Sequence, residues 1–527
     1  MRRPVQLQYK MEDITVQPGR NVLLRIFFLS ALSAGLYGLA SPDLHWHPLC
    51  WVLLIPLLEA LDGMRSRRAF FTGWLCGGMI HLVLLSWVIG TVQRFTHLNL
   101  PLSILAWILL SLYSGLAFGV MASLFCFLSR ARPAQGFIIF PLAYTAMEFL
   151  FPSLFPWHLG AGLYGLIPMI QISDIFGVYG LTALVVLVNF SLWEVFRFFR
   201  KKRPFPRFSL VVAMSLVLLS LLYGVWRIDS IQGYRARAKK LTVGVVQPNI
   251  SNEERMSPPL HPDIWQRYER LSGEAVRENA EFLVWPESAL YFPFDPGAEA
   301  SSSSEMLVRL VRSLDTPLLF GTWSVRPNGP RNTAFLLNRR GNLAGRYDKV
   351  HLLPFGEYIP LSDRFPQISK WIHGAVNLRP GQKIGPLCLE NVCFGVLICY
   401  EATLDGLSRK SAVKGAKFLV NITNDVWFGN TQCPEQHLML ASFRAVENRV
   451  WLVRAANTGI SAFVDPAGRI LDRIPLFQQG ERVRMIELLD VPSIYKAWGD
   501  WFPVSCAVIL TLLLLRGFTV RLKGRQR

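Results

Sequence analysis

The stretch Gly395-Val-Leu-Ile-Cys-Tyr-Glu401 sets the architecture of the C-terminal half of this 527-residue chain. A short apolar run that ends in a cysteine and a glutamate is typical of a buried strand with polar side chains at its end. Two further stretches have the same form: Leu283-Val-Trp-Pro-Glu-Ser-Ala289, and the segment from Gly345 to Tyr358, which carries Lys349. The chain therefore places a thiol, a carboxylate and an amine at strand ends, where catalytic groups are usually held.

Taken singly, each of these side chains has an ordinary interpretation as a core cysteine, a solvated loop carboxylate or a surface lysine. Taken together, they supply the parts of an acyl-transfer site. A thiol nucleophile needs a base that takes its proton, and Glu287 is the candidate for Cys399. Lys349 and the backbone N–H after Cys399 would stabilise the oxyanion, and Lys349 would also favour the thiolate.

Outward from these motifs, strand-like runs recur between about Leu241 and Leu488 and alternate with helical patterns, which favours an α/β layer fold. The predicted strands are Leu241–Gln247, Phe282–Trp285, Pro317–Trp323, Thr333–Asn338, Cys393–Cys399, Phe418–Thr423, Trp451–Ala455 and Ser461–Val464. The predicted helices are Pro262–Asn279, Ser304–Ser313 and Pro434–Arg449.

The chain as a whole has the composition of a membrane protein. Hydrophobic residues make up 51% and charged residues only 17%, against roughly 25% charged residues in a soluble domain. Runs of about 20 apolar residues are long enough to span a bilayer. The candidate spans are Val22–Ala40, Leu44–Leu61, Ala69–Val92, Leu102–Leu128, Gly136–Phe151, Gly177–Phe199, Phe208–Trp226 and Trp501–Val520.

One apolar stretch, Pro152–Ile175, is interrupted by prolines and glycines, so it is not predicted to form a membrane-spanning helix. Irregular backbone at membrane depth must be buried in protein or line a cavity. We expect this stretch to be either a re-entrant piece beside a lipid-access groove or an ordinary interfacial loop.

Basic residues set the expected orientation. The net charge is +19, but Lys and Arg lie in short clusters between apolar runs, a topology signal and not a nucleic-acid stripe. Clusters at residues 2–20, 65–68, 130–132, 197–207 and 521–527 alternate with loops almost free of charge, one of which holds Arg94. Both termini are therefore predicted inside. The predicted domains are 1–226 with about seven spans, an external soluble domain at 227–500, and a last span with a basic tail at 501–527.

The eight cysteines are too few and too scattered for a disulfide framework, and no spacing supports a zinc site, so no metal is expected. Cys388 and Cys393 flank a turn at Glu390–Asn391. They would pair across a hairpin in an oxidising compartment or stay as separate thiols in a reducing one.

Glu287, Lys349 and Cys399, in this order and in these contexts, resemble the nitrilase (carbon–nitrogen hydrolase) superfamily. Within it, the chain is similar over nearly its whole length to the apolipoprotein N-acyltransferase family. Further motifs carry this resemblance: Phe155-Pro-Trp157, Asp174-Ile-Phe-Gly-Val-Tyr-Gly180, Thr423-Asn-Asp-Val-Trp-Phe-Gly429, Gln436-His437, and Arg444, Glu447, Arg454 and Asn457-Thr-Gly459.

The resemblance implies about eight spans and an αββα sandwich with a Glu287–Lys349–Cys399 triad. It gives Glu357 the role of supporting Lys349, and it places Tyr400 and Glu401 in support of the nucleophile.

The implied reaction moves an acyl chain from the sn-1 position of a phospholipid, through a Cys399 thioester, to the N-terminal amine of an S-diacylglyceryl-cysteine apolipoprotein. No cofactor or nucleic acid is implied. We expect a monomer in the bacterial inner membrane, with the catalytic domain on the periplasmic side.

Two other functions stay open: a membrane-tethered amidase or nitrilase for a small substrate, and a non-catalytic lipoprotein-binding component. The aromatic residues at 291–294, 355–371 and 427–428 favour a lipid-facing mouth, although core packing would explain them equally well. Two positions depart from the family pattern. Met256 stands near the place of a usual tryptophan, and Cys433 in the place of a usual glycine.

Overall fold

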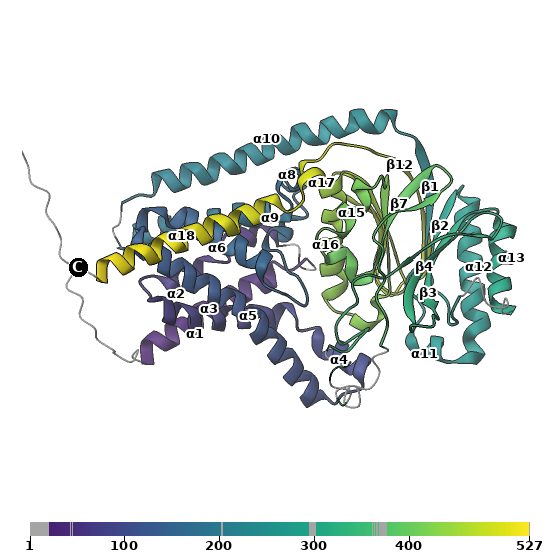
Figure 1. Cartoon of the computed structure of the whole chain (residues 1–527), viewed down its shortest axis with the longest axis horizontal. Coiled ribbons are helices and arrows are strands. Elements are labelled where there is room, and N and C mark those ends of the chain that lie inside the picture. The colour runs from purple at the N-terminus through teal and green to yellow at the C-terminus, as the bar shows by residue number, and fades with distance from the viewer. Residues whose placement is uncertain are drawn as a thin grey trace, which may run out of the picture.

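The computed structural model describes residues 20–525, apart from 43, 45, 202–203, 295–301, 361, 363, 365–366 and 368–376. The protein is elongated, with a helical part at one end and an α/β part at the other (Figure 1). The long helix α10 (Arg207–Arg237) runs from the helical part to the first strand of the α/β part.

The α/β part contains two six-stranded sheets, with strand orders β12-β1-β2-β3-β4-β5 and β11-β10-β9-β8-β7-β6. The first sheet is formed by β1 (Lys240–Gln247), β2 (Phe282–Val284), β3 (Leu318–Ser324), β4 (Arg331–Leu337), β5 (Leu343–Asp348) and β12 (Gly480–Glu487). The second is formed by β6 (Leu387–Leu389), β7 (Val392–Ile398), β8 (Phe418–Thr423), β9 (Trp451–Ala456), β10 (Ser461–Val464) and β11 (Ile470–Ile474).

Apolar side chains from both sheets meet in one core, which includes Phe282 on the first sheet and Phe394 and Phe418 on the second. Helices α12 (His261–Arg277) and α13 (Ser302–Leu314) cover the outer face of the first sheet. Helices α15 (Leu407–Val413) and α16 (Cys433–Asn448) cover the second. This is the αββα sandwich that the family resemblance implies, and it arises because each sheet is apolar on both faces.

Helix α16 lies between the second sheet and the helical part (Figure 1). Its Leu438 and Ala441 pack on the sheet, while Met439 and Phe443 belong to the core of the helical part. Nearly all its residues are buried, as expected of a helix covered on both sides.

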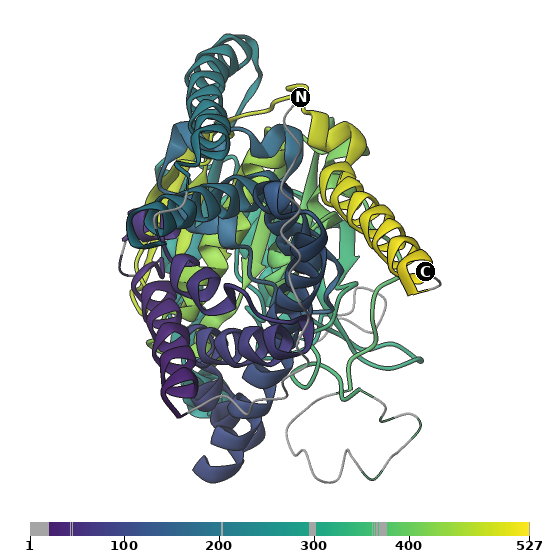
Figure 2. The same cartoon turned by 90° about the vertical axis from the view of Figure 1, so that its left-hand side faces the viewer.

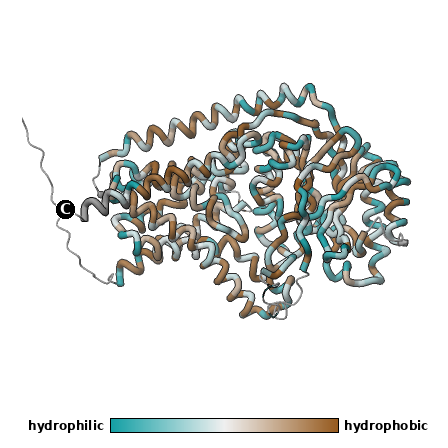
Figure 3. The backbone as a smooth tube through the Cα atoms, in the orientation of Figure 1, coloured by the Kyte–Doolittle hydropathy of each residue, from teal (hydrophilic) through white to brown (hydrophobic). Residues whose placement is uncertain are grey.

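The helical part comprises α1 (Arg20–Leu39), α2 (Ile55–Leu61), α3 (Ser66–Leu84), α4 (Val88–Thr96), α5 (Leu100–Ala131), α6 (Gly136–Leu150), α9 (Val178–Lys201), α10 and α18 (Trp501–Arg525). Among the described residues, four of these helices are long and apolar enough to cross a membrane: α1, α5, α9 and α10. The count is five if α3 and α4 form one bent span. Brown, apolar segments dominate this end of the protein in Figure 3, and α10 and α18 run along different sides of the bundle in Figure 2.

The predicted span Ala69–Val92 corresponds to two helices, α3 and α4, because the helix breaks between them and bends there by 63°. The break has a physical cause that lies elsewhere in the chain. Gln432 Nε2 donates to Val83 O at 2.9 Å and to Leu84 O at 3.2 Å, and Gln436 Nε2 also donates to Leu84 O. Side chains of the α/β part thus take up the carbonyls that the ended helix leaves free.

The predicted irregular stretch Pro152–Ile175 folds into short turns: η3 (Leu159–Leu163), α7 (Ile167–Ile170) and α8 (Ser173–Phe176). Residues His158 to Leu163 are buried. Of the two expectations, the structure supports a segment buried in protein over an interfacial loop.

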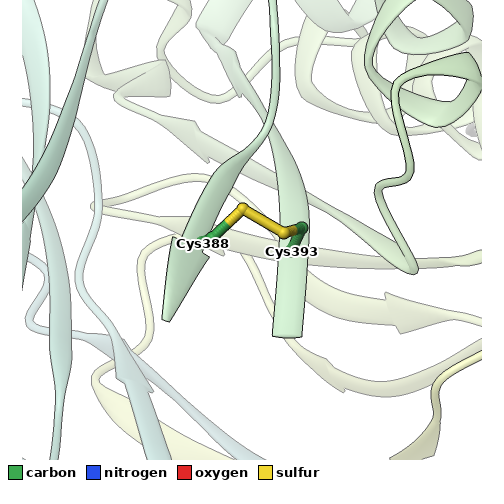
Figure 4. Close-up of a disulfide and its surroundings, with 2 residues drawn as sticks. All are labelled: Cys388 and Cys393. Carbon is green, nitrogen blue, oxygen red and sulfur yellow. A yellow bond between two sulfur atoms is a disulfide. The ribbon is translucent and has the colours of Figure 1, made fainter. Parts of the chain in front are cut away.

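Cys388 and Cys393 form a disulfide across the β6–β7 hairpin (Figure 4). The other six cysteines are free and buried.

Candidate active site

The three predicted catalytic side chains follow strands that end at the same edge of the sandwich. Glu287 comes after β2, Lys349 directly after β5, and Cys399 directly after β7. Strand β2 is parallel to β3, and β5 is antiparallel to β4, which is antiparallel to β3, so β2 and β5 run in one direction. Their carboxyl ends therefore lie at the same edge of the sheet, which is where parallel strands usually form ligand sites.

Lys349 lies between two carboxylates. Its Nζ is 3.5 Å from Glu287 Oε1 and 2.8 Å from Glu357 Oε2. Asn332 Nδ2 donates to both carboxylates, at 2.7 Å to Glu287 and 2.9 Å to Glu357. The backbone N–H of Asn424 donates to Glu287 Oε2 at 2.9 Å. Glu287 is thus held on both oxygens and Lys349 is fixed beside it.

Cys399 occupies a strained turn. Its φ is +52°, a left-handed value that is uncommon for a residue with a side chain and is often found at functional sites. His437 Nε2 donates to the Cys399 carbonyl at 3.0 Å, and Asn421 Nδ2 donates to Leu397 O at 3.0 Å. These contacts hold the end of β7 while the thiol stays 9% exposed.

Glu401 lies fully buried beneath this turn and accepts hydrogen bonds from one hydroxyl and three backbone N–H groups. The donors are Tyr347 Oη, Val350 N, His351 N and Ile398 N, at 2.8–3.1 Å. Its carboxylate therefore links the strand end that carries Cys399 to the loop after Lys349. Tyr400 Oη donates to Leu154 O at 2.7 Å, which ties the nucleophile turn to the helical part.

The electrostatics of the site favour proton transfer at the moment of reaction over a permanent thiolate. Burial raises the pKa of Cys399, Glu287 raises it further, and Lys349 lowers it without cancelling these effects. Burial also raises the pKa of Glu287, which Lys349 opposes. Burial alone would lower the pKa of Lys349, but Glu357 and Glu287 outweigh it, so the pKa is raised and the amine stays charged.

Behind Cys399 lies a polar network that the residue types alone did not reveal. Arg454 Nη2 donates to Asp425 Oδ2 at 2.8 Å and to His437 Nδ1 at 3.1 Å, and Thr423 Oγ1 donates to Asp425 Oδ1 at 2.9 Å. Because a carbonyl oxygen can only accept, His437 carries a proton on Nε2 and donates it to Cys399 O, while its Nδ1 also lies 3.2 Å from Asp425 Oδ1. Asn332, which bridges the two carboxylates, had no motif that marked it.

A narrow pocket opens beside Cys399. Its walls come from both parts of the protein. The α/β part contributes Leu353, Cys399, Tyr400, Thr403, Phe428, Cys433, Gln436, His437 and Leu440, and the helical part contributes His81, Leu84, Leu85, Trp87, Phe155, Pro156 and Trp157. The lining is predominantly apolar and aromatic. Cys399 thus lines a cavity at the junction of the α/β part and the helical part.

Aromatic rings connect the two sides of this pocket. Trp87 lies 4.9 Å from Phe155 and 5.3 Å from Phe428, measured between ring centroids. Of the stretches predicted to form the mouth, 427–428 contributes Phe428 to the pocket lining. At Tyr291–Phe294 the structure shows core packing instead, with Phe294 against Phe320 and Phe335 of β3 and β4. Much of the third stretch, 355–371, lies outside the described residues.

Comparison with known proteins separates the same two parts of the chain, the helical part and the α/β part. Residues 242–494 match the carbon–nitrogen hydrolase family, and residues 33–191 match the N-terminal domain of apolipoprotein N-acyltransferases. The apolipoprotein N-acyltransferase of Geobacter metallireducens is 35% identical over 96% of this chain and 98% of its own length. That of Bdellovibrio bacteriovorus is 30% identical over 86% and 87%. Nit3 of Saccharomyces cerevisiae, a nitrilase-superfamily member, covers 50% of this chain and 95% of its own, with 24% identity and a TM-score of 0.38.

Proposed function

Because the chain belongs to the apolipoprotein N-acyltransferase family and its function is therefore lipoprotein N-acylation, we propose that it uses Cys399 to carry the acyl group. The donor is the sn-1 ester of a membrane phospholipid, and the acceptor is the N-terminal amine of an S-diacylglyceryl-cysteine apolipoprotein. One observation supports this above the others. Cys399 lines an apolar pocket whose remaining walls come from both the α/β part and the apolar helical part, so a substrate with acyl chains would reach Cys399 from the bilayer side.

In the first half-reaction, Glu287 takes the thiol proton while Sγ attacks the ester carbonyl carbon. Lys349 and the backbone N–H of Tyr400 stabilise the negative oxygen of the tetrahedral intermediate. The ester C–O bond then breaks, Glu287 returns the proton to the departing glycerol oxygen, and a lysophospholipid leaves. The acyl chain remains on Cys399 as a thioester.

In the second half-reaction, the acceptor amine attacks the thioester carbonyl. Glu287 takes a proton from the amine, the C–S bond breaks, and the proton returns to the thiolate of Cys399. The product is an amide. The raised pKa of Glu287 suits a group that must both take and give a proton near neutral pH.

The supporting residues have distinct positioning roles. Glu357 and Asn332 hold Lys349 and Glu287 at the distances needed for both steps. Glu401 fixes the loop after Lys349 against the end of β7. Tyr400 orients the nucleophile turn through its hydrogen bond to Leu154 O.

The proposed topology has about eight spans, both termini in the cytoplasm, residues 227–500 in the periplasm and a final span at 501–527, in the bacterial inner membrane. The alternating basic loops support this orientation. The Cys388–Cys393 disulfide is consistent with an oxidising compartment for this domain. A reporter inserted near Ser303 should be active only if exported, and cytoplasmic activity there would contradict the orientation.

Intact-protein mass spectrometry tests the thioester. Purified protein mixed with phospholipid alone should gain the mass of one acyl chain. Hydroxylamine should remove the adduct, and so should a diacylated lipopeptide with a free amine. Cys399→Ala should gain nothing, whereas Cys433→Ala, the matched change of the other thiol that lines the pocket, should still be acylated.

Three results would contradict the proposal. An active preparation whose wild-type mass stays unmodified would indicate direct transfer in a ternary complex. Rapid loss of the adduct to water would favour a membrane-tethered hydrolase. Failure of wild-type protein to acylate any lipopeptide would favour a binding component.

A further inference from the structure

Helix α4 carries one charged side chain in an otherwise uncharged region. Arg94 is the only Lys, Arg, Asp or Glu between Ala69 and Ser129. It lies in a loop region that the basic-residue pattern places on the external side of the membrane, where Arg and Lys are disfavoured. A lone arginine there calls for a local reason.

The guanidinium of Arg94 is held in one place. Its Nε donates to Trp427 O at 2.8 Å, and the neighbouring ring of Phe95 lies 4.1 Å from the ring of Trp427. The guanidinium also lies flat against Gly429, since a Cβ added at that glycine would be 2.7 Å from Nη2. Within the described part of the chain, no carboxylate lies within 4 Å of Arg94. It is therefore an exposed, oriented cation without a counter-charge.

Arg94 lies at the rim of the catalytic pocket. Trp427 and Gly429, which fix it, flank Phe428, and Phe428 lines the pocket with Cys399. At the other end of α4, Trp87 also lines the pocket. Seven residues of helix place Arg94 roughly 10 Å from Trp87 along the axis.

Arg94 lies near the end of the bent α3–α4 pair, which is apolar enough to cross a membrane. An oriented guanidinium is suited to a phosphate oxygen, because Arg presents its remaining N–H donors in a fixed plane. The two proposed substrates differ in this group. A phospholipid has a phosphate one glycerol length from its sn-1 ester. A diacylglyceryl-cysteine has a thioether at that position and no phosphate.

We propose that Arg94 binds the phosphate of the donor phospholipid and so selects the donor in the first half-reaction. This inference rests on the proposed function. It adds the part of the donor that is recognised, and it predicts that the same side chain contributes nothing to recognition of the acceptor.

The test measures thioester formation from two donors with identical acyl chains, phosphatidylglycerol and diacylglycerol, in mixed micelles. The variants are Arg94→Met, Arg94→Lys and, as a matched control, Arg130→Met, which removes an exposed arginine at the far end of α5. Wild type should react about 10–100-fold faster with phosphatidylglycerol, the range expected for a hydrogen bond to a charged group.

Arg94→Met should reduce the phosphatidylglycerol rate to the diacylglycerol rate and leave the diacylglycerol rate within about twofold of wild type. Arg94→Lys should keep part of the preference, and Arg130→Met all of it. Transfer from preformed acyl-enzyme to a lipopeptide should be unchanged in every variant.

Several results would overturn the inference. If Arg94 only fastened α4 to Trp427, Arg94→Met would slow both donors and the second half-reaction equally. Equal wild-type rates for the two donors would show that the phosphate is not recognised. Strong inhibition of wild type by millimolar inorganic phosphate would assign the site to free anions. No thioester from either donor would instead refute the proposed function.

Discussion

The two parts of this protein bury opposite kinds of side chain. In the sandwich, Val284 and Val420 between the sheets are fully buried. In the bundle, Phe28 and Phe208 are 66% and 69% exposed, while Ser33 and Asn189 are fully buried. The reversal shows that the two parts face different solvents: apolar side chains leave water in one part, and in the other small and polar side chains gather where helices meet.

The boundary between the two parts is shielded from both water and lipid. Buried charged side chains lie there, each next to a partner of opposite charge. Arg449, directly after α16, donates to Asp174 at 2.9 Å and to Gln171 Oε1 at 2.6 Å. A second cluster joins Arg444 to Asp405 at 2.7 Å, with His158 3.6 Å from Asp405. Charges excluded from both water and lipid persist only where partners satisfy them. The pocket beside Cys399 lies at this same boundary, so docking of the two parts shapes the site.

The largest expected effect is on the acylation rate, from substitution of the three proposed catalytic side chains beside this boundary. Cys399→Ala should abolish amide formation, because no other group replaces the nucleophile. Glu287→Gln and Lys349→Met should each lower the rate by about 10²–10³. Rates of lipopeptide acylation in micelles provide the measurement. Glu253→Gln, on the external helix α11 (Asn252–Met256), is the control for a lost carboxylate and should retain activity. Near-normal turnover of Cys399→Ala would refute the assignment.

Docking of the two parts should depend on their buried charges. Arg449→Met leaves Asp174 buried with one partner fewer and should lower the free energy of unfolding by about 3–5 kcal/mol. The control is Arg469→Met, which removes an arginine that is 40% exposed and paired with Asp465, and should cost at most about 1 kcal/mol. Denaturant unfolding in micelles compares the two. Equal losses of unfolding free energy in the two variants would mean that charges at the boundary are as well solvated as charges at the surface.

Much of the sandwich could be predicted from the sequence because its central strands are continuous apolar runs. Each of the eight predicted strands has a counterpart. The four missed strands, β5, β6, β11 and β12, are the edge strands of the two sheets and are partly exposed, with sequences such as Gly480-Glu-Arg-Val-Arg-Met-Ile-Glu487 that lack a clean apolar pattern. Edge strands have one unpaired side, so their sequences carry a weaker signal.

The catalytic triad could be proposed from strand ends and motif order, but its surroundings could not. Asn332 is an ordinary strand residue until folding brings it between two carboxylates. The break after α3 depends on Gln432 and Gln436, some 350 positions away in the chain. Long-range contacts of this kind leave no local pattern.

The polar network behind Cys399 should make the sandwich sensitive to acid in a way that the bundle is not. Burial alone would raise the pKa of Asp425, but Arg454, His437 and Thr423 together outweigh it and the pKa is lowered to about 2. A carboxyl with a depressed folded pKa stabilises the fold above its unfolded pKa and loses that contribution as pH falls through the folded value. Between pH 4 and pH 2 this should cost about 2–3 kcal/mol. The pH dependence of urea unfolding in Asp425→Asn should lack this component, and an unchanged slope would contradict the prediction.

Close helix contacts should matter inside the bundle and not on its lipid side. A Cβ at Gly115 would lie 2.5 Å from the backbone N of Gly78, whereas one at Gly35 meets nothing within 4 Å. Gly115→Ala should therefore lower the free energy of unfolding by about 1–3 kcal/mol by forcing α5 away from α3. Gly35→Ala is the matched control and should be neutral or slightly stabilising, since alanine favours helix. Comparable melting temperatures for both variants would argue against tight packing here.

The smallest effect is expected at Met256, an apolar residue of the α/β part that is exposed like the outer side chains of the bundle. Met256 is 80% exposed, an ordinary value for an apolar side chain that faces lipid and an unusual one in water. It ends α11, which is fixed independently by the capping box of Ser251 and Glu254 and by the contact of Arg255 with Ser288 O. Nothing in the fold depends on the methionine side chain, so Met256→Trp should change the free energy of unfolding by less than about 0.5 kcal/mol.

The same variant tests whether this exposed position contacts lipid. We expect lipopeptide acylation by Met256→Trp to stay within about twofold of wild type, because the nucleophile pocket does not include residue 256. The control is Ile264→Trp, at a buried position of α12, which should lose stability through overpacking. A gain or loss of transfer rate above tenfold in Met256→Trp, with stability unchanged, would show that position 256 contacts a substrate. Met256 would then be a lipid-facing side chain like those of the bundle, and this end of α11 would be an exception to the burial of apolar side chains in the α/β part.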